Sequence, residues 1–305
     1  MPEHCTKETC PISDTIYGYA PQLAADTAFL VIFAVSMVIH GIQGYRYKTW
    51  TFLIAMTIGN LCEAIGYGGR IMLHSDPFSD SGFKLQICLL TIAPAFFAAG
   101  IYLTLKHLVL TFGPAFSRLR PSRYTHTFIS CDVVSIILQG VGGILASIAS
   151  QPGPLMTSGN DTMMAGLSFQ VFTLLVFGLL TAEYFTRVRT HRGELNPATE
   201  PLRASTRFRC FLVAVLVAYT AVLLRCVYRI AEMSKGWGST IMRDEDLFLG
   251  LDSGMCALAT VLLNAFHPGL CFGYSMSKTG EVEKLGSADS ERGPVVAGEN
   301  EEEAA

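Results

Sequence analysis

Seven apolar segments, each about as long as a bilayer is thick, constrain the fold of this chain more than any other feature. A helix needs about 20 apolar residues to cross ~30 Å of hydrocarbon, and the segments have about that length. Only 15% of the residues are charged, against about a quarter in soluble domains. The sequence predicts an all-α polytopic membrane protein whose seven-transmembrane-helix bundle occupies residues 21–275. The segments lie at roughly 22–42, 51–74, 84–107, 125–149, 165–185, 209–231 and 247–273.

The basic residues between these segments indicate the orientation, because lysine and arginine are retained in cytoplasmic loops. The loops after the first, third and fifth segments are rich in them, whereas "SDPFSDSG" and "SQPGPLMTSGND" contain none. We therefore expect the N-terminus outside and the C-terminus in the cytoplasm. The sequon at Asn160 falls in a loop that this scheme places outside, which predicts an N-glycosylation site.

The two ends of the chain lie outside the expected bundle. Residues 1–20 are expected to form an extracellular segment with no cleavable signal peptide. Within it, Cys5 and Cys10 either form a disulfide or stay free. Residues 276–305 are polar, Gly-rich and acidic, which predicts a disordered cytoplasmic tail. The net charge of −3 implies no nucleic-acid partner.

Charged and amide side chains inside the apolar segments are the candidate functional residues. A lone charge in hydrocarbon costs about 3 kcal/mol on insertion scales, so each must face protein or water. On the second and sixth segments the polar residues repeat with helical spacing, which places them on one face. Most lie between the midplane and the outer surface, which predicts a polar vestibule open to the outside. The alternative is that opposite charges only hold the helices together. The candidate substrate-binding residues are Glu63, Tyr67, Arg70, Gln86, Asp132, Gln139, Gln170, Arg225, Arg229, Glu232 and Asp252.

Pro94 and the "QGVGG" stretch carry expectations about helix packing. Proline frees a backbone carbonyl in mid-helix, which a membrane protein tolerates where another group satisfies it or where it lines a cavity. The glycines of "QGVGG", near Gly142, are expected to let a neighbouring backbone approach closely.

Four histidines near the cytoplasmic helix ends raise the alternative of a membrane metallohydrolase. These residues are His40, His107, His126 and His267, and no HxxxH or HExxH spacing accompanies them. Since zinc hydrolases commonly show such spacings, we expect no metal, no cofactor and no enzyme activity. A DRY-like motif and NPxxY are also absent, which argues against a typical G-protein-coupled receptor.

Several motifs, in order along the chain, resemble one known family. They are "EAIGYGGR", "LTIAPAFFAAGIY", "FISCDVVSIILQGVGG", "GLSFQ", "RCVYRIAEMSKGWG" and "HPG", with Glu245 seven residues before Asp252. Over residues 17–275 the set resembles the fungal lipid-translocating exporter family, named for resistance to aminocholesterol. The resemblance implies a seven-helix plasma-membrane protein that exports or flips amphiphilic lipids. Its implied substrates are sphingoid long-chain bases, toxic sterol-like amphiphiles, and porphyrin or haem.

Around the aspartate of the last segment the chain departs from that family. Where an aromatic residue and then a proline are expected, it has Leu249 and "DSGM", so the surroundings of Asp252 are expected to differ. A cationic sphingoid amine could be held by Glu63 and Asp252, while the buried arginines balance these acids or meet an anionic headgroup. A receptor-like sensor that binds a lipid from outside without moving it is the alternative. No ATP-binding GxxxxGK[ST] motif is present to drive active transport.

Overall fold

The computed structural model describes residues 10–112, 121–149, 153–190, 200–235 and 239–272, and every regular element in these ranges is helical. The all-α expectation is therefore confirmed for the described part of the chain. In chain order the elements are η1 (Ile12–Asp14), α1 (Leu23–Tyr47), α2 (Trp50–Ser75), α3 (Asp80–Phe112), α4 (Pro121–Ile148), α5 (Pro154–Thr190), α6 (Glu200–Ala204) and α7 (Thr206–Ser234). The last long helix is composite and consists of α8 (Glu245–Leu247), the π-helical turn η5 (Phe248–Gly254) and α9 (Met255–Ala265), after which comes α10 (Pro268–Phe272).

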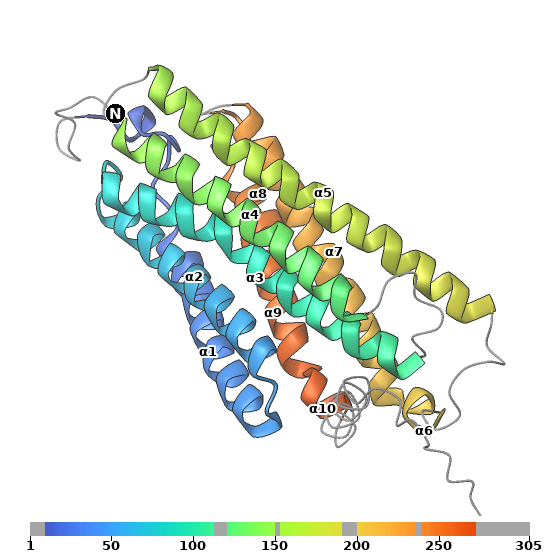
Figure 1. Cartoon of the computed structure of the whole chain (residues 1–305). Helices are drawn as coiled ribbons and strands as arrows, with labels where there is room; N and C mark the ends of the chain where they lie inside the picture. The colour runs from blue at the N-terminus through green and yellow to red at the C-terminus, as the bar shows by residue number, and fades with distance from the viewer. Residues whose placement is uncertain (1–9, 113–120, 150–152, 191–199, 236–238, 273–305) are drawn as a thin grey trace, which may run out of the picture. The chain divides into compact units, whose positions relative to one another are not determined.

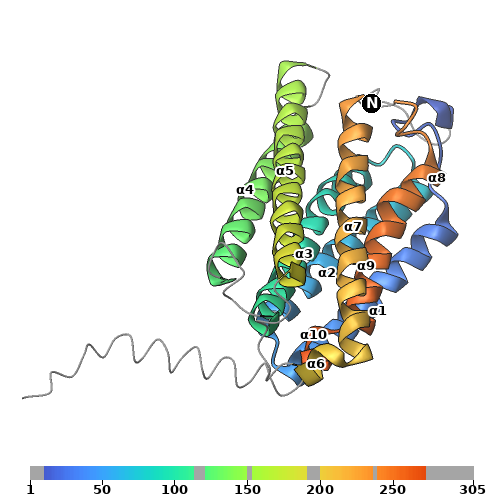
Figure 2. The same cartoon turned by 90° about the vertical axis from the view of Figure 1, so that its right-hand side faces the viewer.

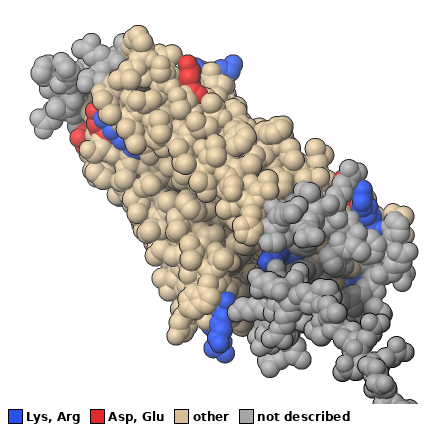
Figure 3. All heavy atoms as spheres, in the orientation of Figure 1, with Lys and Arg blue, Asp and Glu red and all other residues tan. Residues whose placement is uncertain are grey.

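Six of the described helices are long and apolar enough to cross a membrane. They are Leu23–Tyr47, Asp80–Val109, Thr125–Ile148, Pro154–Thr190, Thr206–Ser234 and Glu245–Cys271. Helix α2 is not among them, although it has 26 residues and packs against both α1 and α3. Its buried polar residues, including Asn60, Glu63 and Arg70, lower its apolar content. On the face in Figure 3 the visible charged side chains lie near the two ends, with an uncharged surface between them. These features support an integral membrane protein.

Helix α5 begins earlier than the sequence suggested. The apolar run was expected near residue 165, but the helix starts at Pro154. Proline suits a first helical position because the N–H that it lacks has no partner in the first turn. Asn160 consequently lies in the second turn of α5, so the expectation of a loop at the sequon was wrong.

Helices that follow one another in the chain pack side by side. Figures 1 and 2 show α4 paired with α5 and α7 packed beside α9. Gly142 and Gly159 allow the close approach of α4 and α5. A Cβ added at Gly142 would lie 2.5 Å from the backbone nitrogen of Met163, and one at Gly159 would lie 2.5 Å from that of Ala146. The expectation for the "QGVGG" stretch is confirmed.

The N-terminal segment, residues 10–22, packs on one end of the bundle. Tyr17 is 4% exposed and forms a small core with Leu73, at the end of α2, and Met242, after α7. We call this the Tyr17 end and the opposite one, where α9 finishes, the His267 end. Cys10 is disulfide-bonded, whereas Cys5 and the expected acidic tail at 276–305 lie outside the described residues.

Candidate functional site

The candidate residues chosen from the sequence are all buried, and none is more than 2% exposed. The structure separates them into groups. The largest group, which we call the arginine cluster, consists of Arg225, Arg229, Glu232, Asp252 and Glu63.

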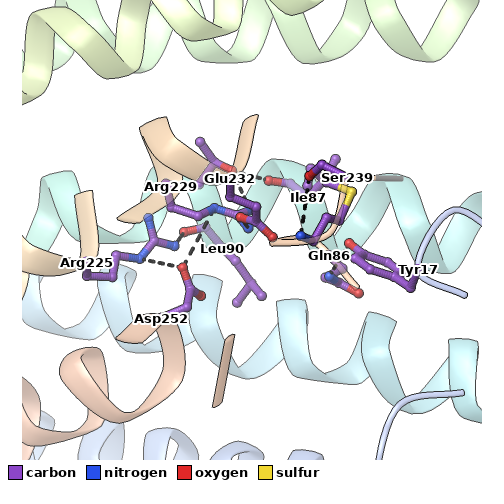
Figure 4. Close-up of polar contacts among 11 residues, drawn as sticks. Tyr17, Gln86, Ile87, Leu90, Arg225, Arg229, Glu232, Ser239 and Asp252 are labelled. Atoms are coloured by element: carbon purple, nitrogen blue, oxygen red, sulfur yellow. Dashed lines mark hydrogen bonds and ion pairs between the residues drawn. The ribbon is translucent and has the colours of Figure 1, made fainter. Parts of the chain in front are cut away.

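Two arginines of α7 share one carboxylate in this cluster (Figure 4). The Nε atom of Arg225 lies 3.2 Å from Oδ1 of Asp252, and Nε of Arg229 lies 3.7 Å from the same oxygen. Arg229 also pairs with Glu232, three residues further along the same helix, where side chains are neighbours. The charges on α7 are thus aligned by helical periodicity and tied to the last long helix by Asp252.

The π-helical turn η5 contains Asp252 and coincides with the place where the sequence departs from the resembling family. Such turns are rare and frequently occur at functional sites, because the extra residue changes the direction of the side chains that follow. Gly250 and Gly254 lie on either side of the aspartate in this turn. The surroundings of Asp252 were expected to differ from those in the family, and the π-helical backbone of this turn offers a local reason for such a difference.

Helix α3 contributes backbone and hydroxyl acceptors to the arginine cluster. Arg225 Nη2 donates a hydrogen bond to the carbonyl oxygen of Leu90, and Arg229 Nη2 donates to Oγ1 of Thr91 at 3.0 Å. Leu90 is four residues before Pro94, so its carbonyl is the one that the proline leaves without a helical N–H partner. The expectation that another group satisfies the carbonyl freed by Pro94 is confirmed: that group is Arg225.

Glu63 lies beside these charges on α2. The Cys256 thiol is the hydrogen-bond partner of its carboxylate, whose electrostatic neighbours also include Arg225 and Asp252. No cation of the described residues lies within ion-pair distance of it. Two arginines therefore face three acids. Burying an ionised carboxylate without a cationic partner is unfavourable, so it must take up a proton or acquire a cation. The cluster can accommodate one more positive charge.

Arg70 belongs to a second group, which we call the terminal clamp, with Asp26 and Glu245. Its Nε lies 2.6 Å from Oδ1 of Asp26 in α1, and its Nη2 lies 3.0 Å from Oε1 of Glu245 in α8. The guanidinium also lies 4.3 Å from the ring centre of Phe248. Sequence reasoning missed Asp26. The sequence feature that could have identified Asp26 is its position as an acidic residue in the first turn of the first apolar helix.

Tyr67 and Gln86 occupy separate positions near these charges. The Tyr67 ring stacks on Phe29 and Phe33 of α1, with ring centres 5.5 and 5.6 Å apart. Gln86 of α3 donates from Nε2 to the Tyr17 hydroxyl at 2.7 Å. Tyr67 therefore packs α2 on α1, whereas Gln86 attaches the N-terminal segment to the bundle.

The N-terminal segment covers the arginine cluster and the clamp at the Tyr17 end. Besides the Tyr17 contact, the backbone N–H of Gln22 donates to Oε1 of Glu245 at 2.8 Å. Burial raises the pKa of Tyr19 to about 12 and also raises the pKa of Tyr17, so both phenols stay protonated at neutral pH. In the described part of the chain the N-terminal segment covers this end of the cluster, and the expected opening to the outside stays a prediction.

Asp132, Gln139 and Gln170 lie in a third group, between α4 and α5. Gln139 Nε2 donates to Oε1 of Gln170 at 2.9 Å and to Oγ of Ser135 at 2.8 Å. The Ser135 hydroxyl in turn donates to the carbonyl of Gly166 at 2.6 Å. The buried Asp132 carboxylate faces the hydroxyls of Tyr102 in α3 and Thr173 in α5. These amides tie the α4–α5 pair together, and a polar vestibule shared by all the candidate residues stays a prediction.

The inner histidines do not form a metal site in the described part of the chain. The rings of His40 and His267 lie 6.2 Å apart, and no group of three or more His, Cys, Asp or Glu that could hold a metal occurs among the described residues. His40 Nε2 lies 3.4 Å from the Thr260 hydroxyl, which donates to Asn60 at 2.9 Å. His267 accepts a hydrogen bond from the N–H of Gly269 at 3.0 Å.

A cavity of about 410 Å³ lies between the start of α5 and the end of α7, at the Tyr17 end. Asn160 lines it, together with Asp161, Met233 and Met242. The other candidate residues do not contribute to its lining. Helix α5 thus directs the sequon asparagine toward α7.

Comparisons with known proteins relate the chain to one family and to relatives that are named as lipid transporters or exporters. A family model described as RTA1 like protein matches residues 56–275. The chain is 33% identical over 293 residues to the sphingoid long-chain base transporter RSB1 of Saccharomyces cerevisiae, an alignment covering 87% of this chain and 76% of the relative. It is 23% identical to the probable lipid transporter atnI of Emericella nidulans, with 83% and 67% covered. It is also 23% identical to the lipid-translocating exporter-like protein RTA1 of Leptosphaeria maculans, with 85% and 52% covered. No solved structure matches.

Proposed function

The chain belongs to the RTA1-like family, and we propose that it is a transporter that moves amphiphilic lipids across a fungal membrane and thereby confers resistance to toxic ones. Sphingoid long-chain bases are the substrates that the relatives favour, since the yeast relative carries that name at 33% identity. Porphyrin and haem remain further candidates from the family resemblance. We propose transport without a chemical step, because the relatives are named transporters or exporters.

The observation that carries this proposal is the unequal number of charges in the arginine cluster. Glu63, Glu232 and Asp252 are buried against two arginines. A sphingoid base carries an ammonium group at the end of a long apolar chain, so it could supply the missing cation beside Glu63. An ion pair that only held the helices together would need no third carboxylate.

We propose seven spans with the Tyr17 end outside, in the plasma membrane. Helix α2 would be the seventh span, since its 26 residues match the 25 of α1 and its charged residues are buried in the protein instead of facing lipid. The basic residues that flank the helices are more numerous at the His267 end, which supports a cytoplasmic location for it. In the described ranges those at this end include Arg46, Lys48, Arg187, Arg189, Arg203, Arg207 and Arg209, whereas Lys84, Lys235 and Arg243 lie at the Tyr17 end.

The test is movement of a labelled long-chain base across liposomes that contain the purified protein, with and without a pH gradient. We expect the wild-type protein to speed the exchange between leaflets and Glu63→Gln to abolish most of that acceleration, because glutamine keeps the shape but removes the charge. Glu63→Asp should retain part of it. The matched control is Glu183→Gln, the same substitution in an α5 residue that pairs with Arg187.

The outcomes separate the alternatives. Binding of the base to wild-type protein without faster exchange would indicate a sensor, and a chemically altered lipid on recovery would indicate an enzyme. Wild-type exchange by Glu63→Gln would make Glu63 a structural residue and refute its role in transport.

A further inference from the structure

An apolar groove lies on the bundle at the opposite end from the N-terminal segment, between α3, α5 and α7. Its volume is about 610 Å³, within the range of sites that hold small molecules. The walls are apolar and aromatic, and Arg189 and Arg209 line its end. Representative wall residues are Ile101, Leu105, Phe177, Phe185, Leu212 and Leu216.

The groove reaches about halfway through the bundle. From Arg209 to Tyr219 along α7 the chain advances ten residues, or ~15 Å at 1.5 Å per residue. This is about half of the ~30 Å hydrocarbon thickness, and therefore the depth of one leaflet. Tyr219 limits the groove at that depth, because its hydroxyl donates to the carbonyl of Leu174 at 2.9 Å and its ring lies against Gly178.

The charge at the groove's end has one sign. Arg189 lies in the last turn of α5 and Arg209 in the first turn of α7, and both are exposed. No carboxylate of the described residues pairs with either arginine, and none lines the groove. By contrast, Arg187 lies 2.7 Å from Glu183. The two guanidinium groups would therefore attract an anion and repel a cationic amine.

We propose that this groove binds one acyl chain of an anionic glycerophospholipid from the adjacent leaflet, with its phosphate between Arg189 and Arg209. Arginine matches phosphate geometry by donating two parallel hydrogen bonds, and basic pockets between spanning helices commonly recognise anionic head groups. An apolar groove in a bilayer is filled by acyl chains, so the arginines select which lipid supplies the chain. The site requires that the helices span the bilayer but not that the protein moves a sphingoid base.

Photo-crosslinking tests the proposal without a transport assay. The protein is placed in phosphatidylcholine bilayers that contain a small fraction of phosphatidate with a photoactivatable acyl chain. Labelled peptides are then identified by mass spectrometry. Parallel bilayers contain the same photoactivatable chain on phosphatidylcholine or on a sphingoid amine. We expect phosphatidate to label the segments 177–189 and 209–219 at least fivefold more than either other lipid.

Two variants distinguish the groove from general surface charge. Arg189→Gln/Arg209→Gln should reduce phosphatidate labelling of the groove to the phosphatidylcholine level. The matched control Arg187→Gln/Arg207→Gln removes the same charge from the same helix ends and should leave the labelling unchanged. Ala182→Trp, which fills the groove from α5, should abolish labelling with the arginines intact.

Four results of the cross-linking experiment would overturn the proposal. They are equal labelling by phosphatidylcholine, preference for the amine, equal loss in the control variant, and protein–protein cross-links from the groove that would identify a second copy of the chain as its occupant. Excess inorganic phosphate should not displace the lipid, since the acyl chain supplies most of the contact; displacement by phosphate alone would indicate an ion site without a lipid chain.

Discussion

Replacing Arg70 with glutamine should destabilise the Tyr17 end of the bundle. Arg70 and Asp26 are both fully buried, and removing one partner of a buried pair costs about 3–5 kcal/mol because the other charge is left uncompensated. The contact with Phe248 adds about 0.5–2 kcal/mol, and the partly exposed pair with Glu245 adds less than about 1 kcal/mol. Together these terms give a loss of about 3.5–8 kcal/mol, a large part of the roughly 5–15 kcal/mol that stabilises a folded protein.

Thermal unfolding of purified protein in nanodiscs measures this loss. At about 2–4 °C per kcal/mol for large domains, we expect Arg70→Gln to lower Tm by at least roughly 7 °C. The Tm of Arg70→Lys should lie between those of the wild-type protein and Arg70→Gln, since one ammonium group cannot bind both carboxylates as the guanidinium does.

A double variant isolates the pair itself. In Asp26→Asn/Arg70→Gln no buried charge is stranded, so we expect it to be more stable than Arg70→Gln alone, with a coupling energy of about 2 kcal/mol or more. The matched control is Lys84→Gln, which breaks an exposed pair with Asp80 and should cost less than about 1 kcal/mol. The reasoning would be refuted if Arg70→Gln were no more damaging than Lys84→Gln.

Three further predictions follow from the described contacts. Arg225→Ala leaves Asp252 with only its longer contact to Arg229 and frees the Leu90 carbonyl. The free energy of unfolding should therefore fall by several kcal/mol, with lower surface expression and a lower Tm. Normal thermal stability would show that Arg225 faces water. Pro94→Ala gives the Leu90 carbonyl a competing helical N–H, which should weaken its hydrogen bond with Arg225. We expect slower lipid movement in the liposome assay and a change in Tm of less than about 5 °C. Unchanged transport would show that this carbonyl has no role in transport. A tag after Lys278 should survive protease added to intact cells and be lost only after permeabilisation, and its loss from intact cells would reverse the proposed orientation.

The helices and the pairing of charges were readable from the sequence for physical reasons. Apolar runs of bilayer length leave few alternatives to helices, and Arg225 and Asp252 are complementary charges that cannot remain alone in hydrocarbon. Asp26 was missed because it lies in the first turn of its apolar run, where an acid is readily interpreted as interfacial. The start of α5 was missed because the polar, Pro-containing stretch from Pro154 resembles a loop in composition.

Other features left no signal in residue type. The π-helical turn at Asp252 is a change of backbone register, which composition does not report. The covering of the Tyr17 end depends on where Tyr17 meets Gln86 and Met242, contacts made across several helices. The separation of Gln139 and Gln170 from the arginine cluster likewise depends on which helices are neighbours. The sequence indicated only how deep each polar residue lies in the membrane, and residues at the same depth can lie on helices that do not touch.

The clamp has a consequence for the order in which the chain assembles during synthesis. Asp26 and Arg70 are 44 residues apart and can meet once the first two helices have left the ribosome. Gln22 and Glu245 are 223 residues apart, a stretch that takes roughly 10–45 s to translate at about 5–20 residues per second. Throughout that interval the first-made segment has no Glu245 to bind. The contact of Tyr17 with Gln86 can form earlier. Insertion of the last helix is therefore the event that completes the attachment of the N-terminal segment, and a nascent chain stalled before Glu245 would hold this segment by its α2 and α3 contacts alone.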